Sequence, residues 1–181
     1  NTQAVITAVD NHQPFLDGLA RRAAKSGMAD KILVQNMSMF ELSFPEQFDV
    51  LWSEGAIYII GFEEGLRTWR PLLKRGGYVA VTEISWLKPN PPTDVFEFWQ
   101  KEYPGMASVD ENRERIRRAG YREIGHFTIP ESSWWQPYYH PIEVRIAGLR
   151  EKYRDNAEAQ SIIDGHADEV EIFRKYSASY G

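Results

Sequence analysis

Acidic side chains stand at or just after the ends of three apolar, strand-like runs in this sequence. These residues are Asp10, Glu54 and Glu83. A carboxylate at the end of a buried strand can bind a ligand or act as a general base. The structural alternative is that Asp10 caps the next helix through the following amides, and that Glu54 sits at a helix N-terminus, stabilised by its dipole. Tyr58 follows shortly after Glu54, about one turn along an expected short helix.

Aromatic side chains form a second candidate group late in the chain. Trp134, Trp135, Tyr138 and His140 lie in an expected proline-bounded loop. Such a group could wall a ligand pocket or surround a cationic amine, because the faces of aromatic rings attract cations. The structural alternative is that these rings cover the core under a long loop or form a dimer interface. His140 is the one histidine that we would test as a base, and the spacing of the histidines predicts no metal site.

The elements that must position these side chains alternate between strand and helix. Apolar, β-branched runs predict five strands, at residues 4–9, 32–34, 48–52, 78–84 and 121–129. We expect the first and the fourth of them to be buried on both faces. Apolar residues at helical spacing, and a capping box of Ser108 and Glu111, predict the helices. These are expected within residues 15–24, 62–73, 93–104, 108–119, 141–153 and 157–176.

Strands that alternate with helices of this length pair in parallel through right-handed crossovers. We therefore expect an open, mostly parallel α/β sheet with helices on both faces. The chain is expected to form a single domain, with a core at residues 1–129 and a late helical and aromatic insertion with C-terminal helices at residues 130–181. Because ligands bind at the carboxyl ends of such strands, the polar residues at strand ends are the candidate site.

Composition limits the function classes. The chain has 181 residues, of which 43% are hydrophobic, and a net charge of −5 from 21 basic and 26 acidic residues. This acidic balance argues against nucleic acid as a partner, and the basic residues of 113–118 interleave with acids as on a solvated helix face. No apolar run is long enough to span a membrane, and no cysteine is present. We expect a cytoplasmic protein with a small-molecule partner and a possible homodimer.

Five segments carry a family resemblance in their order and spacing. They are residues 5–10, 36–38, 48–53, 72–83 and 117–121. The most specific is 72–83, in which Leu-Lys-Arg-Gly-Gly leads into a strand after the earlier Phe-Asp-Val strand. Over about half of the chain, these segments resemble the class I S-adenosylmethionine-dependent methyltransferases, of the small-molecule type seen in ubiquinone-biosynthesis-like enzymes. The resemblance implies a Rossmann-like methyltransferase fold.

The resemblance also implies S-adenosylmethionine as the cofactor and methyl transfer to a small molecule by in-line displacement. It assigns six residues to the cofactor site: Asp10, Asn11, Asn36, Met37, Ser38 and Ser53. Asp10 would accept hydrogen bonds from the ribose hydroxyls, and Met37 would pack on the adenine. Asn36 or Ser38 would meet the adenine amino group. Asn36 departs from the family's more usual aspartate, but an amide can both donate and accept.

The remaining candidates are assigned to chemistry and to the acceptor. The catalytic candidates are Glu54, Tyr58 and His140, and the acceptor-binding candidates are Glu83, Trp86, Trp134, Trp135 and Tyr138. Trp86 is also compatible with packing in a lid. An acidic aromatic pocket would suit an amine, and a neutral aromatic pocket would suit a phenol or a quinone.

Two family features have no counterpart in this sequence. Only nine residues precede Asp10, where the family's glycine-rich loop should lie, and nothing after Tyr180 can supply its last strand. We therefore expect a fragment of a longer enzyme. Two other functions stay open: a non-catalytic, methyltransferase-like partner or regulatory protein, and a nicotinamide-dependent oxidoreductase. Against the second, the sequence has no Tyr-x-x-x-Lys pair.

Overall fold

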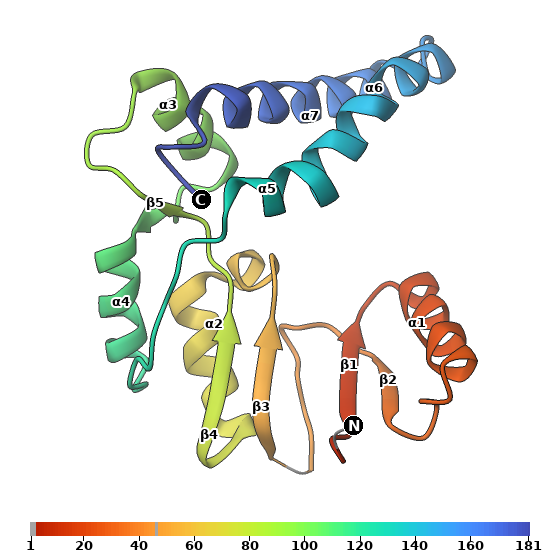
Figure 1. The fold of residues 1–181 in the computed structure, drawn as a ribbon, viewed down its shortest axis with the longest axis vertical. Helices are drawn as coiled ribbons and strands as arrows, with labels where there is room; N and C mark the ends of the chain where they lie inside the picture. The colour runs from red at the N-terminus through yellow and green to blue at the C-terminus, as the bar shows by residue number, and fades with distance from the viewer. Residues whose placement is uncertain (1–2, 46) are drawn as a thin grey trace. The chain divides into compact units, whose positions relative to one another are not determined.

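The computed structural model describes residues 3–45 and 47–181. Their contacts divide the chain into two compact units. Unit 1 comprises Asn1–Trp52 and Thr68–Ala80, and unit 2 comprises Ser53–Arg67 and Val81–Gly181. The colours of Figure 1 follow the chain, so the elements of each unit can be traced through the ribbon. Among the described residues, no helix combines the length and the hydropathy that a membrane-spanning segment needs.

Unit 1 contains two pairs of strands. The first pair is β1 (Ile6–Asp10) and β2 (Ile32–Asn36), which run parallel and are connected by α1 (Gln13–Lys25). The second pair is β3 (Phe48–Ser53) and β4 (Leu73–Val81), whose arrows point the same way in Figure 1. Pro14 at the start of α1 suits the first helical turn, where its missing N–H costs no helical hydrogen bond.

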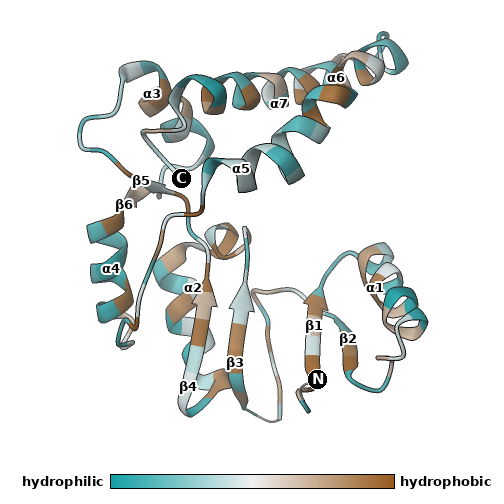
Figure 2. Cartoon of the chain, viewed as in Figure 1, coloured by the Kyte–Doolittle hydropathy of each residue, from teal (hydrophilic) through white to brown (hydrophobic). Residues whose placement is uncertain are grey.

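The strands of unit 1 are less buried than the sequence predicts. The side chains of Ile6, Trp52 and Tyr78 are more than half exposed, so the expectation of strands buried on both faces is wrong for β1 and β4. Figure 2 shows hydrophobic residues along β1, β3 and β4. Within the described residues, each of these strands has one hydrogen-bonded neighbour, and β1 and β3 share no ladder. A strand with one neighbour has less cover for its apolar side chains, which explains the exposure.

Unit 2 is mainly helical. A 3-10 helix, η1 (Ile57–Ile60), precedes α2 (Phe62–Trp69), most of which lies in unit 2. A second 3-10 helix, η2 (Arg70–Leu72), belongs to unit 1 and leads into β4. The short strands β5 (Ser85–Trp86) and β6 (Ala107–Ser108) pair in parallel. The helices of its larger segment are α3 (Thr93–Glu102), α4 (Val109–Arg118), α5 (Glu131–Trp134), the π-helical turn η3 (Trp135–Tyr139), α6 (His140–Lys152) and α7 (Ala157–Tyr176).

An aromatic core holds unit 2 together. Its fully or almost fully buried members come from α3, the loop before β6, η3, α7 and the chain end: Val95, Trp99, Met106, Tyr139, Val170, Phe173 and Tyr180. The rings of Tyr139 and Phe173 lie 4.5 Å apart between centroids. Burial of each such aromatic side chain removes a large apolar area from water, which is the main stabilising contribution in a core. Helices α6 and α7 pack side by side, as Figure 1 shows.

Local signals placed most helices of unit 2 correctly. The predicted bounds of α7 are confirmed, and so is the capping box, in which Ser108 Oγ accepts from the amide of Glu111. The ion-paired face of α4 is confirmed by contacts of Arg118 with Glu63 at 2.6 Å and of Arg113 with Glu123 at 2.9 Å.

Three predictions of secondary structure are wrong. Residues 121–129 form no strand, because within the described residues no strand pairs with them, and an unpaired strand leaves its backbone groups unsatisfied. His126 therefore lies in an irregular segment, with Nδ1 2.7 Å from Glu123. The segment from Trp134 to His140, expected as a proline-bounded loop, is helical instead. The helix predicted over 62–73 ends at Trp69, because Pro71 interrupts it.

Candidate functional site

Most residues expected to bind a cofactor lie in unit 1, at the ends of β1 and β2. Asp10 ends β1 and stands opposite Asn36, which ends β2. Parallel pairing brings both side chains to the carboxyl end of this ladder, where ligands bind in open α/β sheets. Met37 follows directly, and its amide donates to the carbonyl of Asp10 at 3.1 Å.

The carboxylate of Asp10 has a structural contact. Its Oδ1 accepts a hydrogen bond from the amide of His12 at 2.7 Å, and His12 is the N-cap residue of α1. This contact agrees with the helix-capping alternative. An ionised carboxylate has about four acceptor positions on its two oxygens, so one amide contact is compatible with further hydrogen bonds from a ligand.

The neighbouring polar residues of unit 1 also have partners. Asn36 Nδ2 donates to Gln13 Oε1 at 2.8 Å, and Ser38 Oγ accepts from the amide of Phe40 at 3.3 Å. Asn11 is exposed in the turn between β1 and α1. These contacts fix the backbone around the end of the β1–β2 ladder.

The first candidates of unit 2 lie at the end of β3 and just after it. Ser53 accepts a backbone hydrogen bond from Thr82 at 3.1 Å, and the Thr82 hydroxyl accepts one from the amide of Gly55 at 2.8 Å. Between them, Glu54 is exposed. Tyr58 lies in η1, as the predicted short helix requires, and its side chain is 45% exposed.

Glu83 has the most unusual environment of the predicted residues. Its Oε1 accepts a hydrogen bond from the Tyr103 hydroxyl at 2.6 Å, and its buried Oε2 has no hydrogen-bond partner among the described residues. Burial raises the pKa of Glu83 to about 7, although the bond from Tyr103 and the charge of Arg115 both lower it. A carboxyl with this pKa can take up or release a proton near neutrality.

Sequence reasoning missed Tyr103. It follows the end of α3, and its ring packs edge-on against Tyr58, with 5.7 Å between centroids. Burial and the contact with Glu83 raise the pKa of the Tyr103 hydroxyl well above its usual range. The hydroxyl therefore stays protonated and donates a hydrogen bond to Glu83. The sequence offered one indication of its position, because a tyrosine directly before Pro104 is expected to lie at the end of a helix.

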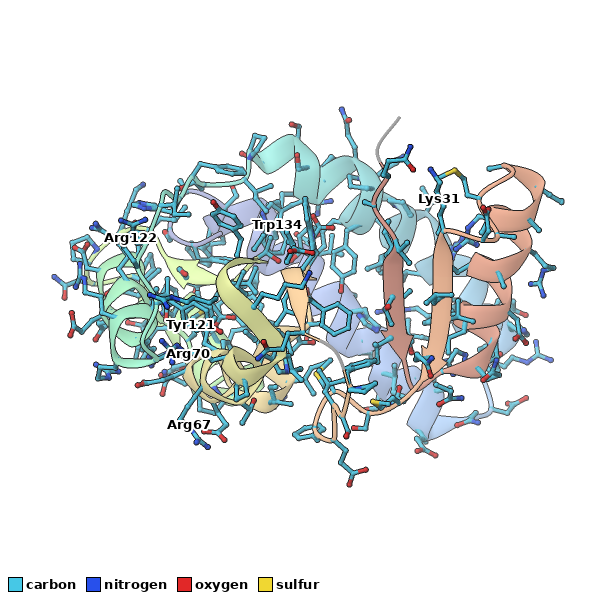
Figure 3. All side chains as sticks on the ribbon, turned by 90° about the horizontal axis from the view of Figure 1, so that it is seen from below. Lys31, Arg67, Arg70, Tyr121, Arg122 and Trp134 are labelled. Carbon is cyan, nitrogen blue, oxygen red and sulfur yellow. The ribbon has the colours of Figure 1, made fainter. Side chains whose placement is uncertain are left out.

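Three predicted tryptophans pack against the aromatic core. Trp86, Trp134 and Trp135 all contact the core cluster, and Trp86 also stacks on Phe96 with centroids 6.0 Å apart. Trp134 is labelled in Figure 3. This placement agrees with the core-covering alternative, and a role in acceptor binding stays a prediction for all three.

Tyr138 and His140 lie closer to solvent. Tyr138 is 43% exposed, and its ring packs edge-on against the buried Tyr139 at 4.9 Å. His140 begins α6, is exposed, and has Nδ1 4.0 Å from Glu143.

Glu169 is a second largely buried carboxyl of unit 2. The acidic residues near it in the sequence are typical of a solvated helix face, but the structure largely covers this side chain. Its carboxylate accepts a hydrogen bond from the Tyr139 hydroxyl at 3.1 Å, and burial raises its pKa. His166 lies 3.9 Å away. The apolar residue next to it, Val170, faces the core and could have indicated that this part of α7 packs against other residues.

A cavity of about 290 Å³ lies elsewhere in unit 2. Its walls include Leu87, Ile129, Trp134, Phe173 and Tyr180. The indole Nε1 of Trp134 is buried and has no hydrogen-bond partner within the described residues. The lining also includes the polar residues Thr128, Glu131 and Ser177, and of the predicted acceptor residues it includes Trp134.

Comparisons with known proteins agree with the family resemblance. Residues 1–81 match the profile of a family described as a methyltransferase domain. No curated protein matches the sequence. The family match covers β1 to β4, including Asp10 and the residues around Asn36.

Solved structures show the fold. A methyltransferase from Geobacter sulfurreducens in complex with S-adenosylhomocysteine matches 97% of this chain at 18% identity and a TM-score of 0.79, over 71% of its own length. One from Thiobacillus denitrificans, in complex with the same compound, matches 98% at 20% identity and a TM-score of 0.76, over 72% of its length.

YjhP from Escherichia coli matches 98% of the chain at 16% identity, with a TM-score of 0.79, over 73% of its length. The [4+2]-cyclase SpnF is matched over 64% of its length. The chain therefore spans about two thirds to three quarters of these relatives. The predicted Rossmann-like methyltransferase fold is confirmed.

Proposed function

We propose that this chain, which has the class I methyltransferase fold and a methyltransferase-domain match over residues 1–81, transfers a methyl group from S-adenosylmethionine to a small-molecule acceptor. The observation that carries the proposal is the register of β1 and β2, which sets the Asp10 carboxylate opposite Asn36 at the carboxyl end of the ladder. Two similar structures were determined with S-adenosylhomocysteine, the demethylated form of this cofactor.

The polar ends of these strands have the chemistry that the cofactor needs. Asp10 would accept hydrogen bonds from the ribose hydroxyls, while Oδ1 keeps its contact with the His12 amide. Met37 would pack against the adenine, with Asn36 and Ser38 at its polar edge. Asn11 and Ser53 complete the proposed set. When bound, the cofactor supplies a methyl group on a positively charged sulfur.

The other candidate residues of unit 2 would act on the acceptor or hold it. Glu54, Tyr58 and His140 are proposed for chemistry, and Glu83 with the aromatic residues Trp86, Trp134, Trp135 and Tyr138 for acceptor binding. Methyl transfer depends mainly on orientation and on exclusion of water, and a proton acceptor makes a modest further contribution. A cytoplasmic location and a homodimer stay predictions from the sequence.

Calorimetric titration with S-adenosylhomocysteine tests this proposal, with NADH as the control ligand. We expect micromolar binding of the first compound alone. Asp10→Ala should weaken it by about tenfold or more, since a charged hydrogen-bond acceptor is lost. Asp30→Ala, which removes an exposed acid from the same unit, should leave it unchanged.

Two outcomes would contradict the proposal. Binding of NADH alone would favour the oxidoreductase. If a folded protein bound neither compound, a non-catalytic, methyltransferase-like protein would be the better account.

A further inference from the structure

Unit 2 contains an acidic, tyrosine-rich cluster that the proposed cofactor site does not explain. Its members are the carboxyls of Glu83 and Glu169 and the rings of Tyr58, Tyr103, Tyr138 and Tyr139. The glutamates each accept a hydrogen bond from one of these tyrosines. Burial and the charge of Glu169 raise the pKa of Tyr138.

The unsatisfied oxygen of Glu83 points to a missing hydrogen-bond donor. Buried polar atoms nearly always have a partner, and leaving one without it is unfavourable. Oε1 has the Tyr103 hydroxyl, whereas Oε2 has no partner in the described part of the chain. A ligand with an N–H group would supply that partner.

The surroundings of Glu83 favour a positively charged donor. Arg115 acts on Glu83 electrostatically, but its Nη1 donates to the carbonyl of Gly105 at 2.9 Å and to Asn112 Oδ1 at 3.1 Å. The Tyr58 and Tyr103 rings, set edge to face, provide the π-faces that attract a cation. A quinone has no hydrogen to donate to the carboxylate, and a phenol has no positive charge for the ring faces to attract.

We propose that the acceptor is an amine and that Glu83, Tyr103 and Tyr58 bind its nitrogen. This inference rests on the proposed methyltransferase function. The protonated amine donates an N–H to Oε2 of Glu83 and lies against the two rings. Tyr103 holds the carboxylate in place through Oε1.

The same contact provides the proton transfer that an amine acceptor needs. An ammonium group has no free electron pair, so it must lose a proton before its nitrogen can accept a methyl group. The N–H bond breaks, its electron pair stays on nitrogen, and the proton moves to Oε2 of Glu83. The carboxylate becomes a neutral carboxyl, which later releases the proton to water. Tyr103 and Arg115 are the groups facing Glu83 that modulate this step.

A matched pair of small probes tests the inference without an identified substrate. Trimethylammonium carries one N–H and a positive charge, and tert-butanol has a similar size without the charge. Each is titrated at pH 8 into protein with ring-labelled tyrosine, followed by NMR, with and without S-adenosylhomocysteine. We expect saturable shifts of the Tyr58 and Tyr103 signals with trimethylammonium only.

Substitutions in the cluster test whether trimethylammonium binds there. Glu83→Gln keeps the shape of the side chain and should weaken trimethylammonium binding by about tenfold or more. Tyr58→Leu, at a half-exposed position, should also weaken it. Glu97→Gln, an exposed glutamate on α3, should bind like the wild type.

Equal binding of tert-butanol, no saturable shift, or unchanged binding by Glu83→Gln would each overturn the inference. The titration without S-adenosylhomocysteine keeps the two proposals separate. Trimethylammonium binding in a protein that fails to bind S-adenosylhomocysteine would support an amine site and contradict the methyltransferase function. The reverse result would retain the methyltransferase function and reject the amine.

Discussion

The two units carry candidate residues of different kinds. In unit 1 they stand at the ends of two paired strands, partly open to solvent, and their places follow from strand register. In unit 2 the candidates Glu54 and His140 are exposed, but the carboxyls of Glu83 and Glu169 are largely buried, with raised pKa values and tyrosine partners. Strand pairing holds the unit 1 residues in fixed positions, which suits a cofactor that is always the same molecule. Side-chain packing positions the unit 2 residues, so substitutions there can alter which acceptor binds.

The aromatic core of unit 2 should be the most sensitive to change. Phe173 is 1% exposed and contacts the rings of Tyr139 and Tyr180. Phe173→Ala should lower the free energy of unfolding by about 3–5 kcal/mol, because it leaves a cavity. Ile162→Ala, on an exposed position of the same helix, should change it by less than about 1 kcal/mol. Urea unfolding measures both, and equal effects would show that the ring cluster is not the core.

The buried Glu83 should make stability depend on pH. Its pKa lies near 4.5 in the unfolded chain and about 7 in the folded protein. The stabilisation is therefore complete below pH 4.5 and is lost as the pH rises through 7. Between pH 5 and 8 this amounts to about 2.5 kcal/mol.

Glu83→Gln, which does not titrate, is the reference for this experiment. Urea unfolding of both proteins at pH 5 and pH 8 should show the extra loss in the wild type alone. If the free energy of unfolding changed equally with pH in the two proteins, the pKa of Glu83 would not differ between the folded and unfolded states.

The Tyr103 hydroxyl should hold the pKa of Glu83 down. It donates to the charged carboxylate, so Tyr103→Phe removes a contact that favours ionisation. The pKa of Glu83 should then rise by about one unit, which corresponds to about 1.4 kcal/mol. Carboxyl-labelled NMR titration reads it directly. Tyr78→Phe, at an exposed position of unit 1, serves as the control. An unchanged pKa of Glu83 in Tyr103→Phe would show that the Tyr103 hydroxyl does not donate to Glu83.

The exposed ion pair between Arg118 and Glu63 in unit 2 should contribute least. Arg118 and Glu63 approach to 2.6 Å, but both side chains are substantially exposed. Arg118→Ala should therefore lower the free energy of unfolding by no more than about 1 kcal/mol. A larger loss in urea unfolding would mean that this pair organises the packing of α4.

The sequence predicted the candidate residues of unit 1 better than the side-chain contacts of unit 2. Residues at strand ends, such as Asp10 and Asn36, were predicted because apolar runs and their polar ends are local patterns. Residues 121–129 alternate like a strand, yet the pattern does not show whether a partner strand pairs with them. The contact between Glu83 and Tyr103 joins residues 20 positions apart, and no local pattern predicts it.

Burial was the other property that local patterns missed. Glu169 belongs to an acidic stretch that suggests a solvated face, but its helix packs against the aromatic core. The apolar residues of β1 and β4 suggest full burial, but each has one strand neighbour among the described residues. In both cases the neighbours of an element, and not its own sequence, determine its exposure.

The most direct test compares the two units in one titration series. The dissociation constant for S-adenosylhomocysteine is measured by calorimetry for the wild type, Asp10→Ala and Glu83→Gln. The account predicts that Asp10→Ala weakens binding by about tenfold or more and that Glu83→Gln leaves it unchanged. Equal weakening by both variants, or unchanged binding by Asp10→Ala, would contradict the assignment of the cofactor to unit 1 and of the acceptor to unit 2.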